Sequence, residues 1–228
     1  MNVISRSFNA FIECGTSRST AKLKPLHGAI AKDIAARLGR GYNVISQGYA
    51  DDKEGTIKGR YIDKKVDITI TKNDEPIAGI AVKFVMQNYS QNSNNYFENM
   101  LGETANIRSN HCPYFQLFII LDKLPYYKKD KTISKWENFT SHNIHKYLIL
   151  SKDDADVYYH TPNKTLLYII HIPDNDEIKT LKEYMDYYST HKYTVELSQT
   201  DIGQYEKTII VNDYEMFINK VYHTIKAL

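Results

Sequence analysis

The segment 65–85 constrains the fold more than any other part of the chain, because it contains two strand patterns joined by a turn. Residues 65–71 alternate polar and apolar side chains, which is typical of a strand with one buried face. The Asn-Asp-Glu-Pro sequence at 73–76 predicts a turn, and the mostly apolar run at 77–85 predicts a second, more buried strand. Together these patterns predict a β-hairpin.

One face of this hairpin combines opposite charges with small side chains. Residues two apart in a strand share a face, so Lys83 lies on the same face as the small residues Gly79 and Ala81. A turn centred near residue 74 places Asp67 opposite residues 81–83. A carboxylate and an ammonium group therefore meet where there is room for something that is not protein.

The rest of the chain alternates between helix and strand patterns, which predicts an α/β fold. The order of these patterns indicates a single domain over residues 1–228, with a mixed central sheet flanked by helices. We expect its core within about 25–172 and a helical segment at 173–228. The expected helices cover 25–38, 96–109, 134–145, 176–189 and 211–226, the further strands lie within 42–62 and at 114–121, 146–150 and 165–172, and polar loops cover 86–96 and 123–135.

The composition excludes several classes of protein. The chain has 228 residues, of which 42% are hydrophobic and 25% charged, as in ordinary globular proteins. Cys14 and Cys112 match neither a disulfide framework nor a metal-ligand spacing, which indicates a reduced, cytoplasmic protein. The N-terminus has no signal-peptide pattern, and the longest apolar runs, 117–121 and 166–172, are too short to span a bilayer. We therefore expect no membrane association.

The charge is distributed unevenly along the chain, although the net charge is only +2. Residues 1–84 carry 14 Lys and Arg against 9 Asp and Glu, which gives +5, whereas residues 85–228 carry 15 against 18, which gives −3. A basic region favours a polyanionic partner. Chance clustering on a solvated surface would produce the same counts.

Asp67 and Lys83 are a pair of residue types that phosphodiester hydrolysis uses. A carboxylate binds Mg²⁺ through oxygen, and the metal lowers the pKa of a bound water. A nearby lysine orients that water or stabilises the negative charge that develops on the phosphate. A partly buried structural ion pair would leave the same pattern, and so would incidental charges on an exposed strand.

The same segment resembles the PD-(D/E)XK nuclease superfamily. There, an Asp on one strand precedes an acidic-x-Lys sequence on the next, and the matching pieces here are Val66-Asp67-Ile68 and Ala81-Val82-Lys83. The chain departs from the pattern at Ala81, which occupies the second acidic position. Some restriction enzymes of the superfamily supply that acid from the following helix. This resemblance points to Glu98, 15 residues after Lys83, with Glu103 as the alternative; a glutamate that only favours a helix N-terminus would look the same.

A second, looser resemblance covers about 30 residues between 92 and 121. The Asn-containing run 92–95, the sequence Gly-Glu-Thr-Ala-Asn at 102–106 and the sequence His-Cys-Pro-Tyr-Phe at 111–115 are similar to the recognition helix and following strand of EcoRI-like restriction enzymes. Residues 123–228 carry no such resemblance. In the superfamily a helix before the hairpin often lends another acid to the metal. The candidates here are Asp33, Glu54 and Asp63, and the sequence does not distinguish between them.

The polar run 87–96 is the most unusual segment of the chain, and its side chains would read DNA bases if it entered the major groove. Asn and Gln pair with the edge of adenine in the major groove, whereas Arg and Lys prefer guanine, and no basic residue lies between Lys83 and Arg108. We therefore expect an A·T-rich target, although a solvated polar loop has the same composition. The expected DNA contacts are Lys58, Arg60, Lys64 and Lys65 at phosphates, and Gln87, Asn88, Gln91, Asn92, Asn94, Asn95 and Arg108, with the Lys- and Tyr-rich run 126–131 as a further candidate.

The resemblance implies a type II restriction endonuclease that acts on double-stranded DNA. Such an enzyme would be a homodimer that cuts both strands of a palindrome and leaves 5′-phosphates. Asp67 and Glu98 would hold Mg²⁺, Lys83 would assist the attacking water, and residues 173–228 would form a dimer contact or a DNA clamp. The alternatives are a repair or structure-specific nuclease of the same superfamily, a non-catalytic DNA-binding module on a decayed nuclease fold, and a Tyr-rich interaction protein.

Overall fold

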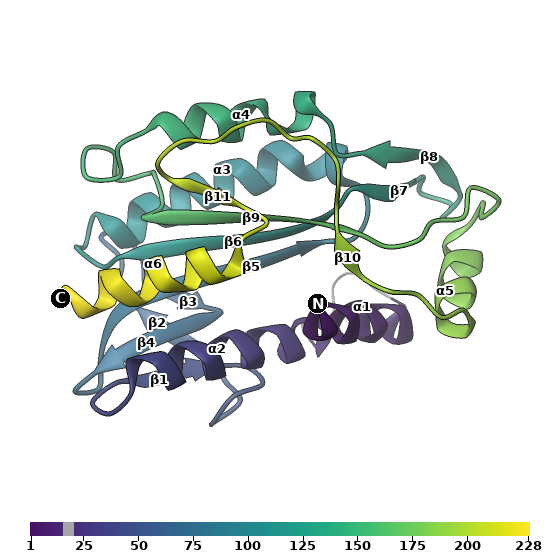
Figure 1. The fold of residues 1–228 in the computed structure, drawn as a ribbon. Coiled ribbons are helices and arrows are strands. Elements are labelled where there is room, and N and C mark those ends of the chain that lie inside the picture. Colours follow the sequence, from purple (N-terminus) through teal and green to yellow (C-terminus); the bar gives the residue numbers. More distant parts are fainter. Residues whose placement is uncertain (16–20) are drawn as a thin grey trace.

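A seven-stranded mixed sheet forms the centre of the molecule, and helices cover both of its faces (Figure 1). The computed structural model describes residues 1–15 and 21–228, and it confirms the expected α/β class with a mixed central sheet. The helices are α1 (Asn2–Cys14), the 3₁₀ turn η1 (Ala21–Leu23), α2 (Lys24–Leu38), α3 (Tyr89–Arg108), α4 (Ser141–Lys152), α5 (Leu181–Thr190) and α6 (Tyr214–Lys226). The strands are β1 (Asn43–Ser46), β2 (Gly55–Ile57), β3 (Lys64–Val66), β4 (Ile68–Lys72), β5 (Glu75–Val85), β6 (Tyr114–Leu121), β7 (Lys123–Tyr127), β8 (Ile133–Asn138), β9 (Lys164–His171), β10 (Glu196–Leu197) and β11 (Ile209–Val211).

The sheet order is β1-β4-β5-β6-β9-β10, with β11 also paired to β9. Strands β5, β6 and β9 are parallel, and all eight residues of β6 are buried, as expected for a strand covered on both faces. The Phe115 ring of β6 lies 6.4 Å from Phe217 of α6, and the Phe118 ring lies 6.0 Å from Tyr147 of α4. Helices α2 and α6 therefore cover one face, and α3 and α4 cover the other (Figure 1).

The predicted hairpin is present, but its first strand is interrupted. Strands β4 and β5 pair antiparallel with Ile68 opposite Ile80, and the two turn residues at 73–74 have positive φ values of 53° and 64°, as tight hairpin turns require. Directly before Ile68 the chain leaves this sheet, because β3 pairs with β2 instead. Asp67 occupies the break between β3 and β4.

The expected polar loop at 86–96 is wrong, because helix α3 already covers most of it. The β7–β8 hairpin holds the start of this helix. The side chain of Asn88 donates to the Tyr127 carbonyl (3.1 Å) and accepts from its amide (2.9 Å), and Glu137 accepts from both the backbone and the hydroxyl of Ser90. These contacts supply partners for the first turn and offset the weak helix propensity of Asn and Ser.

Some of the other helices, strands and loops expected from the sequence are confirmed, and others are wrong. The helix at 25–38 and the strands at 114–121 and 165–172 are confirmed within a residue or so. The loop expected at 123–135 is the β7–β8 hairpin, and the strand expected at 146–150 lies inside α4, where Tyr147 and Leu150 are buried on one helix face. The segment 173–228 contains helices α5 and α6, as expected, and also the strands β10 and β11. Among the described residues, no helix is long and apolar enough to cross a membrane.

Candidate active site

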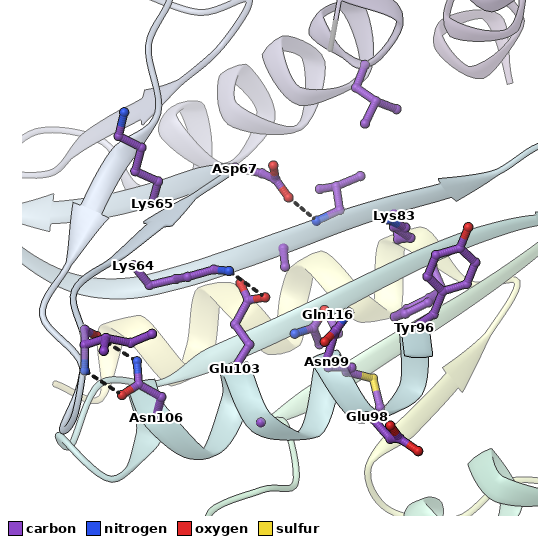
Figure 2. Close-up of a pocket in the computed structure, with 17 residues that line it drawn as sticks. Lys64, Lys65, Asp67, Lys83, Tyr96, Glu98, Asn99, Glu103, Asn106 and Gln116 are labelled. Atoms are coloured by element: carbon purple, nitrogen blue, oxygen red, sulfur yellow. Dashed lines mark hydrogen bonds and ion pairs between the residues drawn. The ribbon is translucent and has the colours of Figure 1, made fainter. Parts of the chain in front are cut away.

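A cavity of about 640 Å³ lies between the β4–β5 hairpin and helix α3 (Figure 2). The cavity is lined by four of the expected catalytic residues, Asp67, Lys83, Glu98 and Glu103. The fold therefore brings together side chains from the hairpin and the following helix. Its walls are formed by Leu23, Ile62, Lys64, Lys65, Asp67, Ala81, Val82, Lys83, Tyr96, Glu98, Asn99, Met100, Gly102, Glu103, Asn106, Gln116 and Phe118.

Asp67 enters the cavity from the break between β3 and β4. Its Oδ2 accepts a hydrogen bond from the Val82 amide (2.7 Å), and its own carbonyl accepts from the Ser46 hydroxyl (2.8 Å). The Asp67 side chain thus accepts the hydrogen bond of the Val82 amide at the point where β3 has left the central sheet. Burial raises the pKa of Asp67 to about 6, the hydrogen bond from Val82 opposes this rise, and the nearby Glu103 adds to it.

Glu103 is the second carboxylate in the cavity, and it projects from α3 toward the strands (Figure 2). Its Oε1 accepts a hydrogen bond from the Tyr114 hydroxyl (2.5 Å), and its Oε2 lies 3.4 Å from Lys64 Nζ. Burial, followed by the charge of Glu103, holds the pKa of Tyr114 well above its usual range, so the tyrosine remains a donor. Two partners therefore fix this carboxylate near Asp67.

Glu98 lines the mouth of the same cavity but is exposed, and its carboxylate points away from Asp67 (Figure 2). Its charge acts on Lys146 of α4, where burial lowers the lysine pKa and Glu98 opposes that change. Glu103, not Glu98, is the acid that acts on Asp67. The alternative named from the sequence therefore has the better geometry.

Lys83 lines the cavity from β5, two residues after Ala81, and its side chain is exposed. Its Nζ lies 4.6 Å from the ring centroid of Tyr96 on α3, which is a cation–π distance. Within the described part of the chain, Lys83 forms no ion pair with Asp67, although its charge lowers the pKa of that group. The two residues face a common space without neutralising each other, unlike a structural ion pair.

Sequence reasoning missed Gln116 and Tyr114 of β6. Ala81 pairs in register with Gln116, which is buried and lies 3.5 Å from the Thr104 hydroxyl of α3. Because the residues of β6 are apolar apart from Gln116, the sequence does not show which of them face α3, and this could be assigned only from the parallel register with β5. The one signal in the sequence was a glutamine inside that run.

The other predicted acids do not reach the cavity. Asp33 of α2 binds Arg37 (2.9 Å) and accepts from the Tyr214 hydroxyl (2.9 Å), which ties α2 to α6. Glu54 accepts a hydrogen bond from the Gln47 side chain (2.9 Å), and Asp63 is exposed and does not line the cavity.

The predicted DNA contacts fall into two groups. Arg108 is buried and donates to the carbonyls of Tyr158 (3.0 Å) and Thr161 (2.6 Å), and Asn88 is bound to β7, so both are structural residues. Asn92 donates to the Asn88 carbonyl, and Gln87 is partly buried. The exposed members of the set are Lys58, Arg60 and Lys65 before the hairpin and Gln91, Asn94 and Asn95 on α3, while Lys64 is partly buried.

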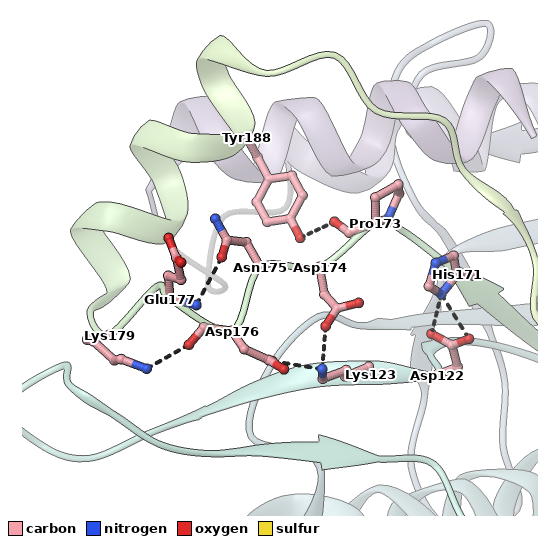
Figure 3. A network of polar contacts seen from close by, with 10 residues as sticks. All are labelled: Asp122, Lys123, His171, Pro173, Asp174, Asn175, Asp176, Glu177, Lys179 and Tyr188. Atoms are coloured by element: carbon pink, nitrogen blue, oxygen red, sulfur yellow. Dashed lines mark hydrogen bonds and ion pairs between the residues drawn. The ribbon is translucent and has the colours of Figure 1, made fainter.

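A second polar network lies where β6 and β9 end (Figure 3). His171 Nδ1 is 3.2 Å from both Asp122 oxygens, and Lys123 forms ion pairs with Asp174 and Asp176. Each of these side chains therefore has an ion-pair or hydrogen-bond partner. The network ties the end of β9 to the start of β7, and it is separate from the cavity.

The donor set of the cavity suits a hard divalent cation. Within residues 1–15 and 21–228, no group of three or more His, Cys, Asp or Glu is placed to hold a metal ion. Mg²⁺, however, is commonly held by one or two carboxylates and retained waters, and Asp67 and Glu103 provide such a pair. No family model, curated protein or solved structure matches this chain.

Proposed function

We propose that the chain is a Mg²⁺-dependent DNA endonuclease of the PD-(D/E)XK type, and more specifically a homodimeric type II restriction enzyme. It would cut a palindromic, A·T-rich site and leave 5′-phosphates. The observation that carries the proposal is that Asp67, Lys83 and Glu103 line one cavity. Lys83 comes from the second hairpin strand and Glu103 from the following helix, as the superfamily pattern assigns them, and Asp67 lies directly before the first hairpin strand. Glu103 would supply the acid absent at Ala81.

The chemistry of hydrolysis follows from these side chains. Asp67 and Glu103 would bind Mg²⁺, which when bound polarises the phosphate and makes its water more acidic. One carboxylate oxygen of Asp67, Oδ2, accepts a hydrogen bond from the Val82 amide, so Oδ1 remains to bind the cation. The exposed ammonium of Lys83 would orient the water or stabilise the charge on the phosphate oxygens. Lys65, at the cavity edge, would contact the DNA backbone.

The exposed polar face of α3 supports a role in reading bases. Gln91, Asn94 and Asn95 lie at i, i+3 and i+4 spacing on that face, and they are exposed. An α-helix fits the major groove, where the amides of Asn and Gln match the edge of adenine. A helix presents such side chains in a fixed order, which the loop expected from the sequence would not do.

Digestion of a sequenced plasmid with Mg²⁺ tests the proposal. We expect discrete fragments with 5′-phosphates, and no cleavage by Lys83→Ala. Glu103→Gln should lower the cleavage rate by about 10²–10³-fold, as removal of one group that stabilises the transition state does. The matched Glu98→Gln should stay within about threefold of the unaltered protein, since its carboxylate points away from Asp67.

Other results of the plasmid digestion would favour a different function or a different metal-binding residue. An uncut plasmid at every Mg²⁺ concentration would sink the nuclease proposal and favour a binding module. Cleavage without discrete fragments would favour a structure-specific nuclease over a restriction enzyme. A larger loss in Glu98→Gln than in Glu103→Gln would show that Glu98 is the metal-binding acid.

A further inference from the structure

The loop between β2 and β3 presents two apolar side chains to solvent beside the cavity. The exposed fractions are 77% for Tyr61 and 65% for Ile62, and Ile62 also lines the cavity. A single exposed apolar residue is ordinary, but two in succession at the edge of a candidate active site indicate a contact surface.

The backbone of this loop is fixed by the end of α3 (Figure 2). Asn106 Oδ1 accepts hydrogen bonds from the amides of Tyr61 (2.9 Å) and Ile62 (3.2 Å), and its Nδ2 donates to the Ile62 carbonyl (2.8 Å). The Arg60 amide donates to the Asn106 carbonyl (2.8 Å), and a Cβ on Gly59 would lie 2.1 Å from Asn106 Nδ2. The backbone that carries the two side chains is thus held in place before any partner binds, which lowers the entropy lost on binding.

The charges around the loop favour a polyanion over an apolar protein surface. Residues 58–65 contain four cations, Lys58, Arg60, Lys64 and Lys65, against the single acid Asp63. The Arg60 guanidinium lies 5.8 Å from the ring centroid of Tyr61. An aromatic ring beside a cation is a combination that stacks on bases while it contacts phosphates.

We propose that Tyr61 and Ile62 form a wedge that inserts into the base stack of the duplex next to the bond held at the cavity. The inference rests on the proposed nuclease function. Apolar side chains unstack base steps in proteins that kink DNA, and the surrounding backbone contacts offset the cost. Insertion at this place unwinds the duplex locally and brings a backbone phosphate toward Asp67 and Glu103.

Unwinding can be measured on a plasmid without knowledge of the target site. A nicked plasmid is ligated under saturating Lys83→Ala protein with Mg²⁺, and its topoisomers are resolved. We expect a lower linking number than without protein. Adding Tyr61→Ala and Ile62→Ala should remove this shift while DNA affinity stays within about threefold, because the phosphate contacts remain. Tyr61→Phe should keep the shift, and so should Met216→Ala, which removes an exposed apolar side chain from α6 on the other face of the sheet.

The outcomes separate this inference from the proposed function. An unchanged linking number at saturation overturns the wedge, and so does a shift that survives the loss of both side chains. If the double variant becomes monomeric in sedimentation and still unwinds DNA, the loop contacts a second copy of the chain and the wedge is wrong. If only the wedge is wrong, the unaltered protein still cleaves the plasmid. If the proposed nuclease function is wrong, the plasmid remains uncut.

Discussion

At the scale of single residues, the cavity holds two carboxylates in different surroundings. Asp67 is partly buried and shares one oxygen with a backbone amide, whereas Glu103 is held by the hydroxyl of Tyr114 and the ammonium of Lys64. Two acids that approach each other in a poorly solvated space raise the free energy of their charged forms. A divalent cation between them turns this repulsion into shared ligation, so the arrangement is costly without a cation and favourable with one.

The raised pKa of Asp67 gives a prediction for stability. Since its folded pKa of about 6 lies above its value of 3.8 in the unfolded chain, Asp67 stabilises the fold below pH 3.8, and this contribution is lost as the pH rises through 6. Asp67→Asn keeps the acceptor for the Val82 amide without a buried charge. We expect it to raise the free energy of unfolding by about 1–3 kcal/mol at pH 8, from roughly 1.4 kcal/mol per pKa unit.

Urea unfolding of Asp67→Asn and the unaltered protein at pH 8 and near pH 4 is the measurement. The gain should shrink toward zero at the lower pH, and plasmid cleavage should be lost at pH 8. A variant that is less stable than the unaltered protein at pH 8 would contradict the burial of a charged Asp67.

At the scale of elements, α3 is where the sequence was least informative. The alternation in 65–71 and the apolar run after the turn were sufficient to predict the hairpin and to place Asp67 opposite the strand of Lys83. The start of α3 depends on contacts with β7 and β8, which are far away in the sequence. Glu98 and Glu103 are five residues apart and so lie about 140° apart around the helix. Choosing between them required the orientation of the whole helix, which no local pattern provides.

Gly102 of α3 gives a prediction at this scale. It is exposed in the helix interior at the cavity wall, and no atom lies within 4 Å of a Cβ placed there. Gly102→Ala should raise the free energy of unfolding by about 0.5–1 kcal/mol, because glycine destabilises helix interiors. Gly102→Phe adds a ring at the cavity and should lower plasmid cleavage at least tenfold, or about 1.4 kcal/mol in activation free energy.

The two variants act as each other's control in thermal unfolding and cleavage assays. Gly102→Ala should keep its activity, so a loss in Gly102→Phe alone is due to the obstructed cavity. Full cleavage by Gly102→Phe would mean that DNA does not approach this part of α3.

At the scale of the whole molecule, residues 173–228 are part of the core and not an appendage. Strands β10 and β11 cover the edge of β9, and the Ser198 hydroxyl donates to Asp122 at the end of β6 (2.7 Å). On α6, the side chains of Phe217 and Ile225 are fully buried. A dimer contact or DNA clamp formed by this segment would therefore use its outer surface, while its inner surface completes the sheet.

Truncation after residue 172 should consequently unfold the chain. Four α6 residues, Phe217, Ile218, Val221 and Ile225, are fully buried, and exposing each costs about 1.5–3 kcal/mol. That total is comparable to the entire stability of a typical domain, about 5–15 kcal/mol. We expect residues 1–172 to lose the cooperative urea transition, whereas removal of Leu228 alone, which is 58% exposed, leaves it unchanged. A cooperative transition in the truncated chain would mean that the segment is a separate unit, and its role in a dimer could then be tested by itself.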